Sequence, residues 1–515
     1  MADVYVPWPR PRAKEFRGPS RAAAAAAVSA YRATAPWVRQ YPALIFFVLL
    51  VAGCLAAWGL QLLCQEYVRV EQRLLVTARI QPGQWLTLEQ LAAGASEVRA
   101  VVPGALLYPL QLLVVRDVLG LVGIITFVSI LAMFAIWLER KVAGWIQSRI
   151  GPMRVGGWHG WSQSLADGIK LIAKEDLIPA GADRMLYRLA PYINFVPALM
   201  GFVALPFGVY WVFRNLDVGL LFILAMLGLE VIGVLLAGWA SNNKWSVFGA
   251  LREAAQVVAY EIPMGMSLLI PVMVAGTLQL AGDDSLMARQ AGGWFNWLAW
   301  HSPWTFVAMF TYFIASLAAC KRAPFDLPEA ESELVAGFHT EYSGFRWSLF
   351  FFAEYAAMFI VSGILVLLFL GGWDAPWVGL APAAWGEPHA PLGAQLLCGV
   401  VFSGPFWFIL KAMLLVYLQM WLRWTLPRLR IDQVLFSCVQ VILPLTMIVL
   451  LASVFWELAL GYSAAFTVFS QVISFVLALV GAAIAVAIVL VALAGLRQRR
   501  ALVGTMGVER PLPGG

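Results

Sequence analysis

The chain has 515 residues, of which 61% are hydrophobic and only 12% charged, with a formal net charge of +6. Soluble domains usually contain about 25% charged residues, so the composition excludes an ordinary soluble protein and indicates a polytopic helical membrane protein. The five cysteines form no C-x-x-C pair, the four histidines are isolated, and no G-x-G-x-x-G or Walker pattern occurs. The sequence therefore predicts no metal, iron–sulfur or nucleotide site in this chain.

The N-terminal part has three expected segments. Residues 1–41 are rich in basic residues and prolines and predict a cytoplasmic tail. Residues 42–64 predict a transmembrane helix, because the apolar run starts too far from the N-terminus for a plain signal peptide. Residues 65–117 are mixed in polarity and predict an extracytoplasmic insert, for which the sequence suggests no function.

Further apolar runs follow, each close to the ~20 residues that a transmembrane helix needs. They lie at 118–138, 191–213, 219–240, 256–280, 304–320, 348–371, 396–421, 436–456 and 464–496. The sequence thus predicts an all-α fold with about ten transmembrane helices. With the N-terminus in the cytoplasm, 27 of the 35 basic residues lie on the cytoplasmic side, so we expect both termini there. Lys411 lies inside an apolar run and needs a partner or a water-filled cavity.

The segment 321–344 concentrates acidic residues between two apolar runs, so we expect a loop at a membrane surface. Five of the 29 acids in the chain lie there, namely Asp326, Glu329, Glu331, Glu333 and Glu341. Asp326 and Glu329 have the spacing of a helix cap with Pro328 in the first turn, which explains these two without any function. Capping does not explain the other three, because massed like charges destabilise a helix.

The sequence of this segment resembles a known family. Residues 324–334 are PFDLPEAESEL and residues 341–344 are EYSG, a pattern similar to the signature of the NuoH family, the quinone-site membrane subunits of NADH:quinone oxidoreductase, respiratory complex I. Similar blocks occur at 139–142, 147–152, 239–256 and 425–433. The likeness covers 118–456 as an eight-helix core, with one added helix on each side and a cytoplasmic tail within 457–515. The chain departs from the pattern at Val439–Gln440 and at Glu253.

An amphipathic helix is expected at 161–175. Trp161, Leu165, Ile169 and Ile172 share one face, whereas Asp167, Lys170 and Lys174 share the opposite one. An interfacial helix on the bilayer would explain this pattern by itself. The resemblance implies in addition that the helix frames an entrance for quinone. It assigns quinone binding to Gln147, Arg149, Asp167, Lys170 and Phe338.

Three carboxylates fall within apolar runs, where a charge is costly and indicates function by default. They are Glu230, Glu261 and Glu354, although Glu354 lies near the start of its run and could instead reach the membrane surface. The resemblance implies catalytic roles for Glu261, Asp326, Glu329, Glu331, Glu333, Glu341 and Glu354. We expect Glu261, Glu329, Glu331 and Glu333 to form a coupled, proton-holding cluster in which some carboxyls titrate near neutrality, because burial and like charges disfavour ionised carboxyls. Nearby cations, among them Arg252, oppose that shift.

By this resemblance the chain is a subunit of an enzyme, the proton-pumping NADH:quinone oxidoreductase of a bacterial inner membrane. It would bind no redox cofactor itself, would form the quinone chamber and would begin an acidic proton path. Quinone is the implied substrate, while NADH, FMN and iron–sulfur clusters would belong to partner subunits. Expected partners are the peripheral iron–sulfur subunits, small membrane subunits and lipid, with no nucleic acid.

Two alternatives remain at this point. The related subunit of an energy-converting hydrogenase, or of a dehydrogenase of reduced deazaflavin coenzyme, carries a similar acidic loop, but the blocks at 241–245 and 426–433 argue against the hydrogenase. A secondary transporter would also have about ten helices and buried carboxylates. Transporters often show internal repeats, and no convincing repeat is visible in this sequence.

Overall fold

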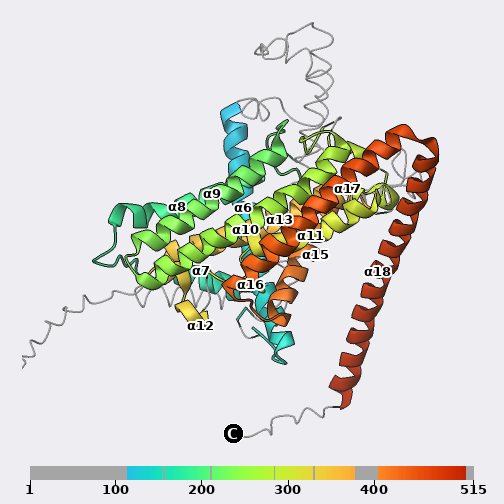
Figure 1. The fold of residues 1–515 in the computed structure, drawn as a ribbon. Helices are drawn as coiled ribbons and strands as arrows, with labels where there is room; N and C mark the ends of the chain where they lie inside the picture. The colour runs from blue at the N-terminus through green and yellow to red at the C-terminus, as the bar shows by residue number, and fades with distance from the viewer. Residues whose placement is uncertain are drawn as a thin grey trace, which may run out of the picture. The chain divides into compact units, whose positions relative to one another are not determined.

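The computed structural model describes residues 113–153, 155–156, 158–208, 212–282, 285–290, 292–328, 331–376 and 404–505. The expected tail, the first expected transmembrane helix and most of the insert lie outside the described residues. All regular elements in the described ranges are helical (Figure 1). The all-α polytopic class predicted from the sequence is therefore confirmed.

The long helices follow the order of the apolar runs. They are α6 (Leu113–Ile146), α8 (Arg184–Ala204), α9 (Gly219–Ala240), α10 (Lys244–Ala275), α11 (Pro303–Ala319), α13 (Gly344–Phe369), α15 (Gly404–Thr425), α17 (Leu443–Tyr462) and α18 (Ala464–Thr505). Short elements are α7 (Gln163–Ala173), α12 (Glu331–Leu334), α16 (Ile431–Leu435), the π-helical η8 (Phe436–Ile442) and the 3-10 turns η1 (Trp158–Gly160), η2 (Ala288–Gln290), η3 (Trp294–Asn296), η4 (Leu298–Trp300) and η5 (Gly337–His339). Among the described residues, seven helical segments are long and apolar enough to cross a membrane, and α11 is a shorter apolar helix.

Two expected boundaries were wrong. Helix α10 begins at Lys244 rather than near 256, because the side chain of Asn243 caps it by accepting a hydrogen bond from the Trp245 backbone N–H at 3.0 Å. Residues 244–255, which precede the apolar run expected at 256–280, are therefore helical as well. The run at 436–456 belongs to a longer helical segment, because α16, η8 and α17 follow one another without a break.

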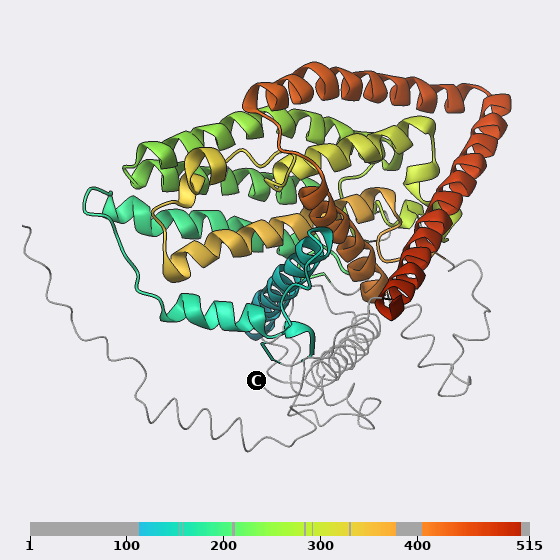
Figure 2. The same ribbon diagram turned by 90° about the horizontal axis from the view of Figure 1, so that it is seen from below.

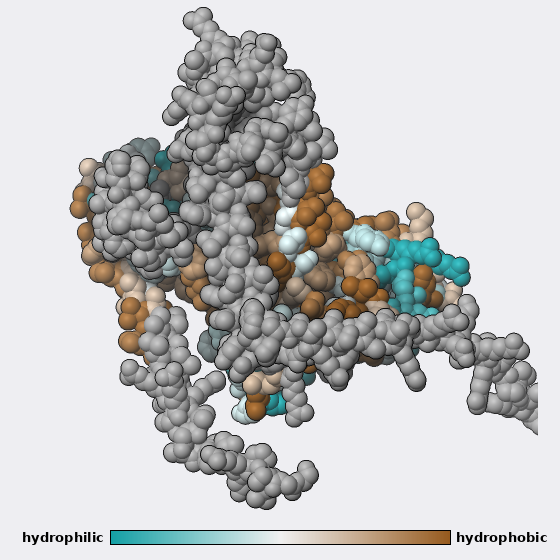
Figure 3. Space-filling view, turned by 180° about the vertical axis from the view of Figure 1, so that it is seen from behind, coloured by the Kyte–Doolittle hydropathy of each residue, from teal (hydrophilic) through white to brown (hydrophobic). Residues whose placement is uncertain are grey.

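Helix α13 lies at the centre of the bundle and packs against α6, α8, α11 and α15. In its most apolar stretch 89% of the residues are buried, compared with 17% in α18. Large apolar side chains remain exposed on the outer helices. On the face seen in Figure 3 the described residues are mainly hydrophobic, and the largest hydrophilic group lies at one side. Such a surface suits a lipid environment rather than water.

Loops that we expected on the same side of the membrane contact one another. At one end of the bundle, Ser343 Oγ donates to the Glu175 carbonyl at 3.2 Å, and Asn242 Nδ2 donates to the Gly181 carbonyl at 3.0 Å. The expected extracytoplasmic loops also meet, because the Trp294 backbone N–H donates to the carbonyl of residue 376 at 3.0 Å. The expected cytoplasmic loops thus contact one another, and so do the expected extracytoplasmic loops, as in a chain whose successive helices cross a membrane in alternating directions.

The buried Lys411 has the partners that its position requires. Its Nζ donates to the carbonyls of Leu370, Gly372 and Asp374 at 2.7, 3.1 and 2.7 Å, and it lies 4.2 Å from the centre of the Trp297 ring. These carbonyls follow the end of α13, where backbone acceptors have no intrahelical partner. Lys411 therefore donates hydrogen bonds to backbone carbonyls at the end of the central helix, which would otherwise have no partner there.

A second, small unit of the chain contains 152–163. Within it, Trp161 Nε1 donates to the Gly156 carbonyl at 2.9 Å. Helix α7, which begins at the end of this stretch, corresponds to the amphipathic helix expected at 161–175. Its apolar residues Leu165, Ile169 and Ile172 are exposed, as expected for a helix that lies on a membrane surface or against a partner.

Candidate functional site

Two consecutive basic residues, Lys321 and Arg322, follow the end of α11, and their side chains extend into the bundle. Lys321 has left-handed backbone geometry (φ 52°), which is uncommon for a residue with a side chain. Both side chains are buried, with 7% and 1% of their surface exposed. Because a buried cation needs a partner, the residues around these two define the site.

Arg322 belongs to a group of charged and hydrogen-bonding side chains that we call the arginine cluster: Arg322, Glu139, Glu354, Tyr355 and Arg423. Its guanidinium lies 2.8 and 2.9 Å from the two carboxylate oxygens of Glu139 and 2.8 Å from Glu354 Oε1. Tyr355 and Arg423 each donate a hydrogen bond of 2.6 Å to Glu139. The cluster therefore joins α6, α13 and α15 to the loop after α11.

Lys321 belongs to a separate group, the lysine cluster, with Glu230 and Glu253. Its Nζ lies 3.3 Å from a carboxylate oxygen of each. Glu253 is 1% exposed, and its Oε2 has no hydrogen-bond partner among the described residues. A buried carboxylate oxygen without a donor is costly unless water reaches it.

A cavity of about 110 Å³ supplies room for that water. Its lining includes Glu230, Glu253 and Lys321 of the lysine cluster, together with Tyr260 and Glu261. At about 30 Å³ for each water molecule in the liquid, the space holds roughly three to four. The cavity thus connects the lysine cluster with Glu261, whose side chain is exposed on the outer face of α10.

The charges in the two clusters do not balance. Four carboxylates, those of Glu139, Glu230, Glu253 and Glu354, face three cations, and Glu261 adds a fifth acid at the cavity. Uncompensated charge is expensive in a low-dielectric interior. The two clusters therefore place more carboxylates than cations inside the bundle.

The acids of the 321–344 loop occupy different environments. Asp326 is half-buried, and burial raises its pKa against the opposing effect of Arg423. Glu333 is exposed and lies 2.6 Å from Arg252 and 3.2 Å from Arg428. The hydrogen bond from Arg252 lowers the pKa of Glu333, so Glu333 is not one of the carboxyls of the expected cluster that titrate near neutrality.

The expected helix cap at Asp326 is also wrong, because the described helix α12 begins only at Glu331. Phe325 and Leu327 are buried with residues of α10, α11 and α16, which holds the segment as a packed turn. Glu329 lies outside the described residues, as does the side chain of Glu331.

Two further predicted acids have clear partners. Glu354 takes part in the arginine cluster through its contact with Arg322. Glu341 accepts a hydrogen bond of 2.7 Å from Asn243 Nδ2, and its backbone carbonyl accepts one of 2.7 Å from the Tyr187 hydroxyl. Glu341 therefore ties the loop to α8 and to the start of α10.

Four of the residues assigned to quinone binding lie on exposed or partly exposed surface. Gln147 and Arg149 are exposed just beyond α6. On α7, Lys170 is exposed and lies 3.5 Å from Asp167, which also forms an ion pair of 2.5 Å with Arg140 of α6. This ion pair joins α7 to the end of α6 and places the polar face of α7 beside the chain that carries Gln147.

Phe338, the fifth assigned residue, is buried in the bundle, with 2% of its surface exposed. The Lys321 ammonium lies 5.6 Å from the centre of its ring. The neighbouring His339 is also buried, and burial together with Lys321 lowers its pKa to about 4. Phe338 therefore touches the lysine cluster from inside the bundle.

Several residues of the site were not assigned to it from the sequence. They are Glu139, Tyr355 and Arg423 of the arginine cluster, and Glu253, which was noted only as a departure. Glu139 is 183 residues from Arg322 and 284 from Arg423, so no spacing in the sequence relates them. The one available signal was the presence of Glu139 and Arg423 at the ends of apolar runs.

No group of three or more His, Cys, Asp and Glu side chains within the described ranges could hold a metal ion. The site is instead made of paired charges, a hydratable cavity and an acidic loop at one end of the bundle. These features define the class of protein: a polytopic helical membrane protein that holds ionisable groups inside its membrane part.

Comparisons with known proteins identify the family. The model of the NADH dehydrogenase family matches residues 119–454. The NADH-quinone oxidoreductase H subunit of Chlorobium luteolum is 42% identical over 351 residues, covering 68% of this chain and 90% of that protein. The corresponding protein of Anaeromyxobacter dehalogenans is 42% identical and covers 67% and 83%. One from Rhizobium meliloti is 43% identical and covers 63% and 92%. The chain belongs to the NADH dehydrogenase family of membrane subunits.

Proposed function

We propose that this chain is the membrane subunit of a proton-pumping NADH:quinone oxidoreductase that walls the quinone chamber and begins the proton path. The family and the names of its relatives support the assignment. Quinone is the proposed substrate, and NADH, FMN and the iron–sulfur clusters are assigned to partner subunits. The related hydrogenase subunits and a secondary transporter are not favoured by these relatives.

One observation carries the mechanism: adjacent residues of a single loop reach both buried clusters. Arg322 enters the arginine cluster and Lys321 the lysine cluster, while the same loop continues to Asp326 and Glu333 at the end of the bundle. A change of charge near this loop alters the field at both clusters. Because the clusters hold more acid than base, such a change shifts how many protons they bind.

In this proposal quinone reaches the loop from the membrane surface along α7. The exposed apolar side chains of α7 suit the lipid side of an entrance, and Asp167 and Lys170 lie on its polar side. Gln147 and Arg149 are exposed at the neighbouring end of α6. A quinone head group accepts hydrogen bonds, so cationic and amide donors on this surface are suitable partners.

Glu261 supports a contact with another membrane subunit. Its side chain is exposed, and the neighbouring Val258 and Ile262 are 69% and 53% exposed. A carboxylate that faces lipid costs at least about 2.5–3.5 kcal/mol near the centre of a bilayer. We propose that a small membrane subunit of the complex covers this face and continues the proton path from the cavity.

The charge distribution supports a location in the bacterial inner membrane with both termini in the cytoplasm. On this topology the arginine cluster and the 321–344 loop lie toward the cytoplasm, where peripheral iron–sulfur subunits would bind. Residues 42–64 and the segment 457–515 would add one transmembrane helix each to the family core at 118–456.

The test is to replace single members of the lysine cluster in the assembled complex. Glu253→Gln keeps size and hydrogen-bonding capacity but cannot titrate, and Lys321→Gln removes the cation that two carboxylates share. We expect each variant to assemble, to reduce an artificial electron acceptor normally, and to lose quinone-linked proton pumping by at least about tenfold.

Glu175→Gln is the matched control, because it neutralises an exposed acid at the same end of the bundle. It should pump as the unaltered complex does. Proton pumping at the normal ratio in both cluster variants would refute the proposed path. A parallel loss of artificial-acceptor activity and of assembled complex would show instead that the cluster is structural.

A further inference from the structure

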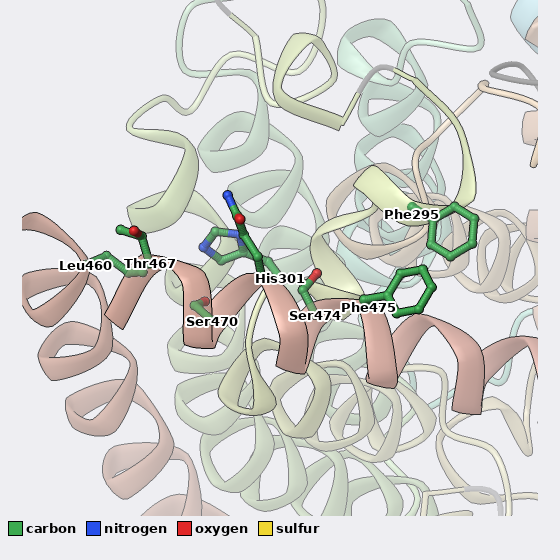
Figure 4. A pocket seen from close by; sticks show the side chains of 8 residues that line it. Phe295, His301, Leu460, Thr467, Ser470, Ser474 and Phe475 are labelled. Carbon is green, nitrogen blue, oxygen red and sulfur yellow. The ribbon is translucent and has the colours of Figure 1, made fainter. Parts of the chain in front are cut away.

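A second cavity lies beside the start of α18, next to the turn that follows α17 (Figure 4). Figure 2 shows α18, in red, diverging from α17 beyond that turn. It has a volume of about 410 Å³ and is lined by Phe295, His301, Leu460, Thr467, Ser470, Gln471, Ser474 and Phe475. We call it the α18 groove. More than half of this lining comes from α18, which lies beyond the residues matched by the family.

A polar stripe runs along the side of α18 that faces the groove. Ser470 and Gln471 each lie three or four residues from Thr467 and from Ser474, which places all four on one side of the helix. The other faces carry exposed apolar residues, including Val468, Val472 and Val476. The groove is therefore the polar side of an otherwise lipid-compatible helix.

This stripe extends along the first three turns of α18. At 1.5 Å per residue, Gln471 and Ser474 lie roughly 10 and 15 Å along α18 from its first residue. Neither side chain makes a hydrogen bond to another described residue. Because unpaired amide and hydroxyl groups are costly wherever water is scarce, the groove suits an occupant that offers polar partners to these two side chains.

Tryptophans mark the level of the groove in the membrane. Trp294 Nε1 donates to the Ala478 carbonyl at 3.0 Å, and Trp456 Nε1 donates to Ser470 Oγ at 3.3 Å. Trp300 packs against α18 at Gly481. Tryptophan is enriched where the bilayer meets water, so this end of α18 lies at the level of lipid head groups and glycerol esters.

The charges at the groove select among lipids. His301 Nε2 and Glu457 Oε1 are 2.9 Å apart, and both side chains remain about one third exposed. The lining contains no Lys or Arg among the described residues, whereas anionic lipids are recognised by clusters of basic residues. A carboxylate can accept from an ammonium group, and hydroxyl and amide groups can donate to a phosphate.

We propose that the α18 groove binds a zwitterionic phospholipid with a primary-amine head group, phosphatidylethanolamine. Its ammonium group donates to Glu457, and its phosphate and ester oxygens accept from Gln471 and Ser474. The acyl chains leave along the exposed rings of Phe295 and Phe475, which stack at 5.6 Å. The volume falls within the usual range of about 300–1,000 Å³ for sites that bind small molecules.

The test measures lipid bound to the purified complex, reconstituted in nanodiscs that contain phosphatidylethanolamine, phosphatidylcholine or phosphatidylglycerol. After release into mild detergent, native mass spectrometry counts the lipids that remain. We expect the unaltered complex to retain one phosphatidylethanolamine more than Gln471→Leu or Glu457→Gln, whose affinity should fall at least about tenfold. Phosphatidylcholine, which has no N–H donor, should be retained poorly by all forms.

Gln440→Leu is the matched control, because it makes the same change at an exposed glutamine of η8, outside the groove. It should retain lipid as the unaltered complex does, and electrophoresis of the intact complex confirms assembly of each variant. Equal retention by the groove variants, or equal retention of all three lipids, would overturn the proposal. A photo-cross-link from residue 475 to another subunit would overturn it as well, because a protein would then fill the groove.

Discussion

Removing Arg322 should destabilise the chain strongly, because its guanidinium is 1% exposed and compensates two buried carboxylates. In the Arg322→Met variant Glu139 keeps its contact with Arg423 at 2.6 Å, but the described ion pairs of Glu354 include no other cation. Breaking one side of a buried ion pair costs about 3–5 kcal/mol. Since Glu139 remains paired, we expect a loss near the lower limit, about 3 kcal/mol in the free energy of unfolding.

The measurement is reversible denaturant titration of the chain in mixed lipid–detergent micelles. Arg428→Met is the matched control, because Arg428 and its partner Glu333, 3.2 Å apart, are both accessible to solvent, and a pair at the surface contributes no more than about 1 kcal/mol. The double variant Arg322→Met, Glu354→Met should recover part of the stability, since it removes both charges together. Normal stability of Arg322→Met, or a double variant worse than the sum of the single changes, would refute this account.

Two acids of the loop should respond to pH in opposite ways. Burial raises the pKa of Asp326, so protonation of this carboxyl stabilises the fold. That stabilisation is lost as the pH rises through the raised pKa. Asp326→Asn should therefore raise the melting temperature at neutral pH but not near pH 3, and a lower melting temperature at neutral pH would contradict this. Arg252 lowers the pKa of Glu333, so the ionised carboxylate stabilises the fold at neutral pH. That stabilisation is lost as the pH falls through the lowered pKa. Glu333→Gln should lower the free energy of unfolding by no more than about 1 kcal/mol at low salt, because the side chain is exposed, and by less at high salt. A loss that salt does not change would argue against an ion pair.

The loop after α11 shows how local and long-range information differ. Its sequence has the spacing of a helix cap at Asp326, yet Phe325 and Leu327 are buried against α10, α11 and α16, and the described helix begins later at Glu331. Burial of two large apolar side chains contributes several kcal/mol, more than the ~1 kcal/mol that a cap provides. The packing of distant helices therefore decides the local structure here.

Hydropathy by itself determined the helical membrane class and the order of the helices, because each crossing needs its own stretch of about 20 apolar residues. It also indicated Glu230, Glu261 and Lys411, since an isolated charge within such a stretch is costly wherever its partner lies. Only the tertiary structure decided which charges pair. Lys321 and Arg322 are adjacent in the chain but join different clusters, and Glu139 meets Arg322 across 183 residues. Ion pairing depends on distances of a few ångströms between side chains, and those distances are set by how α6, α9, α10, α13 and α15 pack together rather than by any local pattern in the sequence.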